Sequence, residues 1–495
     1  MTRLKKFEKF LPLTIFLVAF GYYYALSSKI FTWVYTSGDA GDWLTQLRWW
    51  QVPHTWGKPL YILMVKGVNL LPFGNDVSKI TLLSIVTGAV MVMFTYMIAR
   101  NITKKTHLGI IAAIVVLGCT IVLSQATVLE QYTVAGALLM AFFYFYQQEK
   151  LLWAFVFLGL TTAVHEVGLV FFVLFLVIEF SRIKVFLKYI PVYALFGLVP
   201  YFLILGMMVS HSTPKLMAGF LSLESLNSYG GNTTVAAALA LTEAPRRLSD
   251  MAMILLPALG FALVPIILTF KQPWDTKKKV VIVFFLFILW FYITNLFPSV
   301  WKWLAMVIPL LVCMAMVALD KLPNWHKRTV ALGATVFCVV NIFAFNANIL
   351  AHDKPLATEY YQDLQALPDG SCVITPRGGE YGFAIFYAMS KGKDLIPLAL
   401  GRTDTEKWLA PIHDQGYRDY LWWLKKDYDI VGTNVYEIVK DAMAKGHSVY
   451  FATPMTKMWE VAFIYEDNTE GWLYKVTDVV KDPVFPNAKS KSKGK

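Results

Sequence analysis

Long apolar runs set the first limit on what this chain can fold into. A run of about 18 to 25 apolar residues is long enough to cross the hydrocarbon core of a bilayer as a helix. Hydrophobic residues make up 57% of the chain and charged residues 16%, which is far from the balance of a soluble domain. We therefore predict an α-helical polytopic membrane protein with about eleven spans, at 10–28, 78–99, 107–125, 128–147, 151–165, 167–181, 186–210, 251–270, 280–297, 303–319 and 329–350.

Basic residues indicate the orientation of these spans. Lysine and arginine gather in alternate loops, for example at Arg100 to Lys105 and at Lys277 to Lys279, as the positive-inside rule expects of cytoplasmic loops. This places the N-terminus in the cytoplasm, with the first apolar segment kept as an anchor. It also requires that 57–73 lie in the membrane plane or re-enter at the outer face. The net charge of +12 comes mostly from these loops, so nucleic acid is not an expected partner.

The residues after the last predicted span differ in character from the rest. "SCVITP" and "HSVYFATP" alternate as strands do, whereas "EYYQDLQAL" and "YEIVKDAMAK" have helical spacing. An odd number of crossings puts this region outside the cytoplasm. The predicted organisation is a transmembrane domain at 1–350, an extracytoplasmic α/β domain at 351–485 and a disordered basic tail at 486–495.

Ionisable residues gather at one membrane face in this topology. Acids and histidines are costly at membrane depth, so their placement is informative. Three different outer turns supply them, which suggests one site, although each has a simpler interpretation as a helix cap or as a satisfied pair between helix ends. The candidates are Asp39, Asp42 and His54 in the first turn, Glu130 in the second, and His165 with Glu166 in the third.

Basic residues on the same face add a possible anion site. The outer loop 211–250 ends with Arg246 and Arg247, and Lys302 lies at the outer end of the tenth predicted span. The planar fork of arginine suits phosphate groups. An anionic lipid headgroup and a lipid-linked phosphate are both partners of this chemistry, so simple anchoring to headgroups stays open.

Short motifs around these residues resemble a known family. "DAGD", Asp39 to Asp42, is similar to an Asp-Ser-Gly-Glu-like motif, and "HTWGKPL" keeps His54, Gly57, Pro59 and Leu60 of a second one. A Leu-Leu-Pro-Phe-Gly stretch follows at Leu70 to Gly74, and then a Glu-x-Tyr element at Glu130 and Tyr132. Together they resemble the GT-C class of integral-membrane glycosyltransferases, in the branch related to protein O-mannosyltransferases. The likeness covers about residues 30–170.

The resemblance implies transfer of a sugar, mannose or a similar hexose, from a polyprenyl-phosphate donor to a hydroxyl of a protein, glycan or lipid at the outer face. Such a reaction needs a general base, for which Asp39 is the first candidate and Asp42 the second. A single displacement inverts the anomeric carbon. The departing phosphate needs cations or hydrogen-bond donors. The substrate-binding candidates are His54, Lys58, Arg246 and Arg247 for the phosphate, with Glu130, Tyr132, His165 and Glu166 beside them.

Other classes of protein remain as alternatives. A secondary transporter usually has inverted repeats and ionisable residues at the bilayer midplane, and this chain has neither. A polymerase or ligase of lipid-linked glycans and a scaffolding protein also stay open. No cofactor is implied, and a divalent metal at the acidic cluster is left open. Because the outer region lacks disulfides, a prokaryotic cell membrane is favoured over the endoplasmic reticulum.

Overall fold

The described part of the chain forms two compact units. The helical unit comprises Met1–Thr32, His54–Ser210 and Met217–Asp353, and the sheet unit comprises Trp33–Pro53, His211–Leu216 and Lys354–Lys495. We describe each unit by itself. The computed structural model describes residues 2–28, 43–44, 46–48, 58–210, 249, 262–270, 276–294, 302–351, 356–376, 387–388, 391–400, 439–440, 442–452, 463–466 and 473–481.

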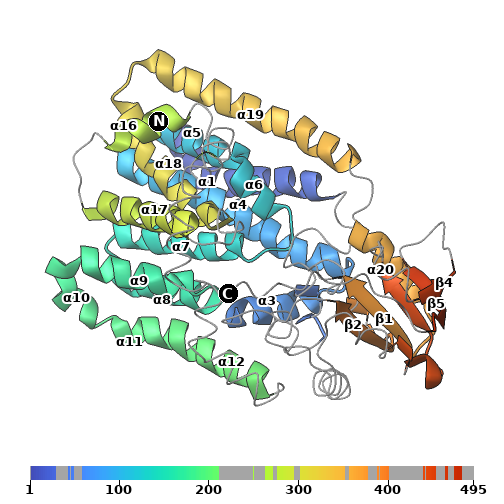
Figure 1. Ribbon diagram of the computed structural model, residues 1–495. Coiled ribbons are helices and arrows are strands. Elements are labelled where there is room, and N and C mark those ends of the chain that lie inside the picture. The colour runs from blue at the N-terminus through green and yellow to red at the C-terminus, as the bar shows by residue number, and fades with distance from the viewer. Residues whose placement is uncertain are drawn as a thin grey trace, which may run out of the picture. The chain divides into compact units, whose positions relative to one another are not determined.

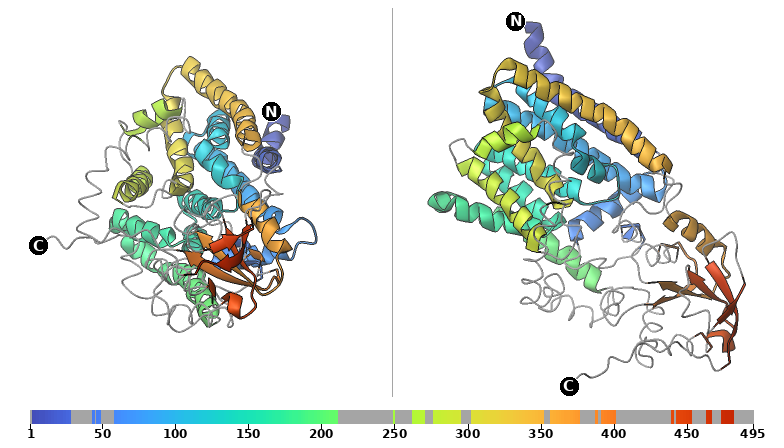
Figure 2. Two further views of the ribbon diagram at one scale, coloured as in Figure 1. Left: turned by 45° about the vertical axis from the view of Figure 1, so that its right-hand side comes forward. Right: turned by 45° about the horizontal axis from the view of Figure 1, so that its top comes forward.

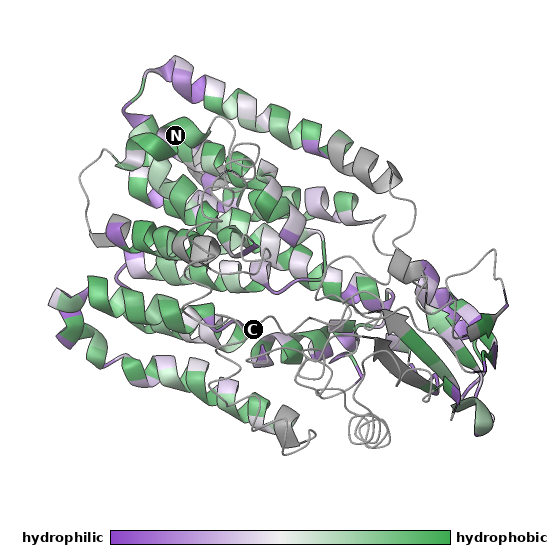
Figure 3. Ribbon diagram, in the orientation of Figure 1, coloured by the Kyte–Doolittle hydropathy of each residue, from purple (hydrophilic) through white to green (hydrophobic). Residues whose placement is uncertain are grey.

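The helical unit is built around one long helix, α4 (Asp76–Thr103), which packs on α1, α5, α7 and α18 (Figures 1 and 2). Apolar residues cover these helices along most of their length (Figure 3). The other helices are α1 (Thr2–Ser27), α3 (Pro59–Asn69), α5 (Thr106–Gly118), α6 (Thr120–Ala126), α7 (Tyr132–Gln147), α8 (Leu151–Val164), α9 (Val167–Ile178), α10 (Ile183–Leu187), α11 (Ile190–Tyr193), α12 (Val199–Ser210), α16 (Leu263–Phe270), α17 (Thr276–Thr294), α18 (Leu304–Asp320) and α19 (Asn324–Ala351).

The described helices account for only part of the predicted spans. Among the described residues, three helical segments are long and apolar enough to cross a membrane, or four if one bent pair is counted. Shorter apolar helices cover further predicted ranges, including 151–165, 167–181 and 303–319. Of the predicted span 251–270, the structure describes only 262–270. The total of eleven spans stays a prediction.

The predicted span 107–125 corresponds to two helices with a bend between them. Cys119 has an extended backbone, with φ −67° and ψ 116°, and it separates α5 from α6. The two helices differ in direction by 66°. The break is stabilised from α19, because the Asn341 Nδ2 donates a hydrogen bond of 2.7 Å to the Gly118 carbonyl oxygen. A buried carbonyl that has lost its helical partner is thus satisfied.

A short helix follows the first predicted outer turn. The eleven residues of α3 extend about 16 Å at 1.5 Å per residue, roughly half the hydrocarbon thickness of a bilayer. It is thus too short to cross, as the sequence predicted for 57–73. A turn then leads into α4, whose first turn is capped by the Asn75 side chain accepting a 2.8 Å hydrogen bond from the Ser78 backbone N–H.

The sheet unit contains a five-stranded sheet in the order β2-β1-β3-β5-β4. β1 runs parallel to β2 and to β3, whereas β5 runs antiparallel to β3 and to β4. Tyr360 and Leu364 of α20 are buried with Val373, Leu395 and Leu473 of the strands. Two of the predicted strands, "SCVITP" and part of "HSVYFATP", are β1 and β3. The bounds are α20 (Leu356–Ala366), β1 (Ser371–Pro376), β2 (Leu395–Leu400), β3 (Val449–Ala452), β4 (Phe463–Tyr465) and β5 (Leu473–Val479).

The turn between α8 and α9 depends on a glycine. A Cβ at Gly168 would lie 2.5 Å from the Thr162 nitrogen and 2.7 Å from the Thr161 carbonyl carbon, both of which are backbone atoms. We predict that Gly168→Ala destabilises the protein by about 1–3 kcal/mol, the usual cost of overpacking. Gly206→Ala is the control, because a Cβ at Gly206 would have nothing within 4 Å. Thermal unfolding in detergent measures both, and equal midpoints for the two variants would contradict the prediction.

Candidate functional site

Five of the predicted site residues lie within the described part of the helical unit. They are Lys58, Glu130, Tyr132, His165 and Glu166. The other five, Asp39, Asp42, His54, Arg246 and Arg247, lie outside the described residues. The five described residues come from the start of α3, the start of α7 and the turn between α8 and α9. Contacts between these elements bring all five into one connected cluster.

Glu130 is fully buried in the short connection between α6 and α7. Ser84 of α4 fixes its backbone, because the Ser84 Oγ donates to the Glu130 carbonyl oxygen at 3.1 Å and lies 3.4 Å from the Glu130 nitrogen. The Glu130 side chain accepts a hydrogen bond from Lys302, with 2.7 Å between Oε1 and Nζ. Since a carboxylate without a counter-ion is costly inside a protein, this pair explains how Glu130 is accommodated.

Lys302 and Trp303 lie just before α18 and connect it to the other elements. The Lys302 ammonium lies 5.9 Å from the centroid of the Tyr132 ring, within the range of a cation–π contact. The Trp303 ring packs edge-on against His165, with 5.4 Å between the centroids and an interplanar angle of 82°. Tyr132 lies 5.6 Å from the His165 ring. His165 is therefore held between two aromatic rings from different helices.

His165 ends α8 and is 1% exposed. Its Nδ1 accepts a hydrogen bond of 3.2 Å from the Val167 backbone N–H. This nitrogen therefore carries a lone pair rather than a proton in the observed geometry. The same Nδ1 lies 3.4 Å from the Glu166 Oε2, so that contact is a close approach and not an ion pair.

Glu166 forms its ion pair with Lys58 instead. The Lys58 Nζ donates to the Glu166 Oε2, although 108 residues separate the two in the chain. Burial favours the protonated acid, but the positive charge and hydrogen bond of Lys58 lower the pKa of the Glu166 carboxyl, in the turn between helices, below its usual range. Glu166 is therefore ionised at neutral pH, and Lys58 is the cation that balances it.

The cluster combines two buried lysine–glutamate pairs with an imidazole and a phenol. Lysine ammonium groups bind phosphate as compact point charges, and carboxylates and histidine can accept protons. The sequence indicated Lys302 but not its pairing with Glu130, and it did not single out Trp303 or Ser84. The signal available for Trp303 was the "VWKWL" stretch, where a lysine lies between two tryptophans in an otherwise apolar segment.

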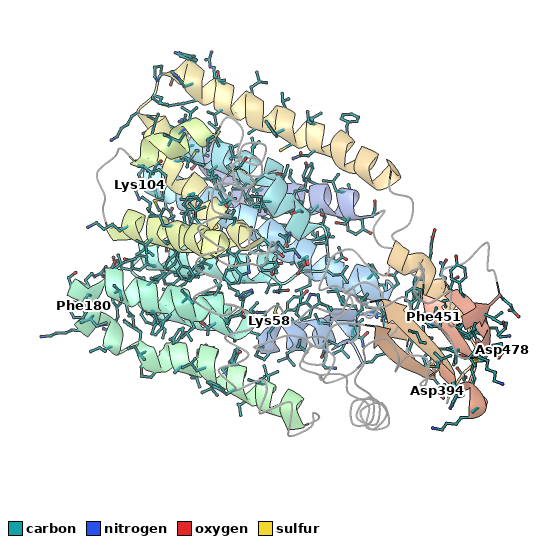
Figure 4. The ribbon with its side chains drawn as sticks, in the orientation of Figure 1. Lys58, Lys104, Phe180, Asp394, Phe451 and Asp478 are labelled. Carbon is teal, nitrogen blue, oxygen red and sulfur yellow. The ribbon has the colours of Figure 1, made fainter. Side chains whose placement is uncertain are left out.

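Lys104 and Phe180 lie toward one end of the helical unit, well separated from Lys58 (Figure 4). Near Lys104 and Phe180, the neighbouring basic residues Lys105 and Arg182 form ion pairs and are 45% and 36% exposed. Lys105 binds Asp320 at 2.6 Å, and Arg182 binds Glu149 at 2.8 Å. Within the described ranges, no group of three or more histidine, cysteine or acidic residues is arranged to hold a metal ion.

One family matches the part of the chain that contains most of the site. Residues 39–186 match the family described as protein O-mannosyl-transferase TMEM260 N-terminal domain. The matched range starts at Asp39 and includes His54, Lys58, Glu130 and the His165–Glu166 turn. No curated protein matches the chain.

Solved structures with the same fold are membrane enzymes of the GT-C class. The crystal structure of ArnT from Cupriavidus metallidurans bound to undecaprenyl phosphate matches with a TM-score of 0.60 and 14% identity, over 98% of this chain and 100% of that chain. Its apo form matches with the same score and identity, over 96% and 98%. The Archaeoglobus fulgidus oligosaccharyltransferase in complex with Zn and sulfate matches with a TM-score of 0.52 and 11% identity, over 93% and 72%.

These matches confirm the resemblance inferred from the sequence motifs. The chain has a GT-C fold, and its N-terminal part is similar to protein O-mannosyltransferases. At 14% and 11% identity, the structural matches establish the fold rather than the reaction.

The buried Glu130–Lys302 pair gives a test of the site's stability. Removing one partner of a buried pair costs about 3–5 kcal/mol, because the other charge is left uncompensated. We predict a loss of this size for Lys302→Met, and a clearly smaller loss for the double variant Glu130→Gln with Lys302→Met. A double-mutant cycle on thermal unfolding in detergent measures the coupling. Additive losses would show that the two charges do not depend on each other.

Proposed function

We propose that the protein is an integral-membrane glycosyltransferase that moves a sugar from a polyprenyl-phosphate donor to an acceptor hydroxyl at the extracytoplasmic face. The observation that carries this proposal is the cluster in which Lys58, Glu130, His165 and Glu166 meet, all of them within the range matched by the O-mannosyltransferase family. The GT-C fold adds support, because ArnT has been crystallised with undecaprenyl phosphate.

Lysine side chains are the proposed contacts for the phosphate group of the donor. A lipid phosphate that leaves the sugar gains negative charge, and cations held in a fixed position stabilise that charge in the transition state. Lys58 is the described candidate that the sequence predicted, and Lys302 lies in the same cluster. His54, Arg246 and Arg247 are proposed as further phosphate contacts on the basis of the sequence.

The proposed reaction is one displacement with inversion. The acceptor hydroxyl loses its proton to the Asp39 carboxylate, its oxygen bonds to the anomeric carbon, and the bond from that carbon to the phosphate oxygen breaks with its electron pair. Asp42 is the second candidate for the base. Mannose or a similar hexose is the proposed sugar, and the hydroxyl of a protein, glycan or lipid is the proposed acceptor. No step requires a metal, and a divalent ion beside Asp39 and Asp42 stays untested.

The topology that accompanies this function has a cytoplasmic N-terminus and about eleven spans. It places the cluster and the sheet unit outside the cytoplasm, and a prokaryotic cell membrane is the favoured location. The separation of Lys58 from Lys104 (Figure 4) is consistent with this topology.

A substitution at Asp39 tests the chemistry. Asp39→Asn keeps size and hydrogen-bonding capacity but removes the base, so transfer should fall by about 10²- to 10⁴-fold. An aspartate that only caps a helix tolerates asparagine, so the same substitution should then have little effect. Transfer of a radiolabelled hexose from polyprenyl phosphate by purified protein is the measurement, with thermal unfolding as the control for folding. Wild-type rates in both Asp39→Asn and Asp42→Asn would remove the first outer turn from the catalytic centre.

A further inference from the structure

The side chain of Lys58 is buried, and its backbone conformation is one that its surroundings must impose. Its side chain is 6% exposed, and its backbone has the left-handed φ of 46°, a region that residues other than glycine occupy only when their surroundings impose it. Pro59 follows it, and proline disfavours the right-handed helical conformation in the residue before it. The position of Lys58 is thus determined by its contacts and by the start of α3.

Glu166 is the contact that fixes the charged end of Lys58. Among the described residues, it is the hydrogen-bond partner of the Lys58 ammonium. An ammonium group has three N–H donors, and among the described residues Glu166 takes up one of them. The carboxylate also provides the negative charge that a buried cation requires.

We propose that Glu166 is a positioning residue, which holds the Lys58 ammonium so that its remaining donors bind the phosphate of the lipid-linked donor. This inference rests on the proposed function and names the device by which that site binds phosphate. Glu166 does not touch the reacting atoms. It balances the charge of Lys58 and fixes its direction, and His165 and Gly168 in turn fix the turn that carries Glu166.

The proposal requires that the lysine lie on α3 and the glutamate on α9, and not only that an ion pair is present. Lys58 lies at the start of α3 and Glu166 at the start of α9, so exchanging the two residues would restore the ion pair with the cation on the opposite element. A purely structural ion pair tolerates such an exchange. A phosphate site does not, because the spare N–H donors would then start from α9.

The experiment measures binding of undecaprenyl phosphate to the purified full chain in detergent, with the uncharged polyprenol as the reference ligand. Glu166→Gln should weaken phosphate-dependent binding by about tenfold to a hundredfold, the range for a lost charged hydrogen bond. The double variant Lys58→Glu with Glu166→Lys should have a higher thermal midpoint than either of these substitutions alone, because the ion pair is restored. It should not recover the phosphate-dependent binding. Asp320→Asn, which breaks a lysine–carboxylate pair outside the cluster, should bind as the wild type does.

Two sets of results distinguish a failure of this inference from a failure of the proposed function. If Lys58→Met loses phosphate-dependent binding but Glu166→Gln and the exchanged variant bind as the wild type does, then Glu166 does not position Lys58 and only the inference fails. If the wild type binds undecaprenyl phosphate no better than polyprenol, or if Lys58→Met binds normally, the phosphate assignment in the proposed function fails and the inference fails with it.

Discussion

Neutralising charge inside an apolar helical unit is the constraint on which this site depends. An uncompensated ion is expensive in such surroundings, and a pair is tolerated only when its geometry is good and its other hydrogen bonds are satisfied. Lys302 provides the counter-ion for Glu130, and Ser84 donates a hydrogen bond to its backbone carbonyl and accepts one from its backbone N–H. Lys58 provides the counter-ion for Glu166. Each pair joins elements that are distant in the chain, so the same contacts that stabilise the charges also assemble the site.

The sequence predicted the class of protein and grouped several site residues at one membrane face, because both predictions rest on patterns within short segments. Apolar runs mark helices that are suited to lipid, and basic loops mark the expected cytoplasmic ends. The predicted topology placed Glu130 and the His165–Glu166 turn on one side of the membrane, and the contact between Tyr132 and His165 shows that the two turns lie close together. The pairings themselves were not predictable, because Lys58 and Glu166 are 108 residues apart and Glu130 and Lys302 are 172 apart. Asp39, Asp42 and His54 stay predictions.

The break between α5 and α6 shows why helix geometry was harder to predict than helix location. The stretch "THLGIIAAIVVLGCTIVLSQA" contains no proline and reads as one continuous apolar helix. The bend at Cys119 depends on Asn341, which donates to the Gly118 carbonyl from α19, and on the close approach of Cys338 to Gly118. A partner more than 200 residues away therefore decides the local structure, as tertiary contacts often do in membrane helices.

The lysines of the cluster are less exposed than Lys105 and Arg182, which pair with carboxylates elsewhere in the helical unit. Lys105 is 45% exposed and Arg182 is 36% exposed in their pairs, and exposed pairs of this kind contribute little to stability. Lys58 and Lys302 are 6% and 14% exposed, so their charges are desolvated and their directions are fixed. Electrostatic stabilisation of an anion that forms during a reaction requires charges that are already desolvated and fixed in direction. The burial of Lys58 and Lys302 is what the proposed function requires of them.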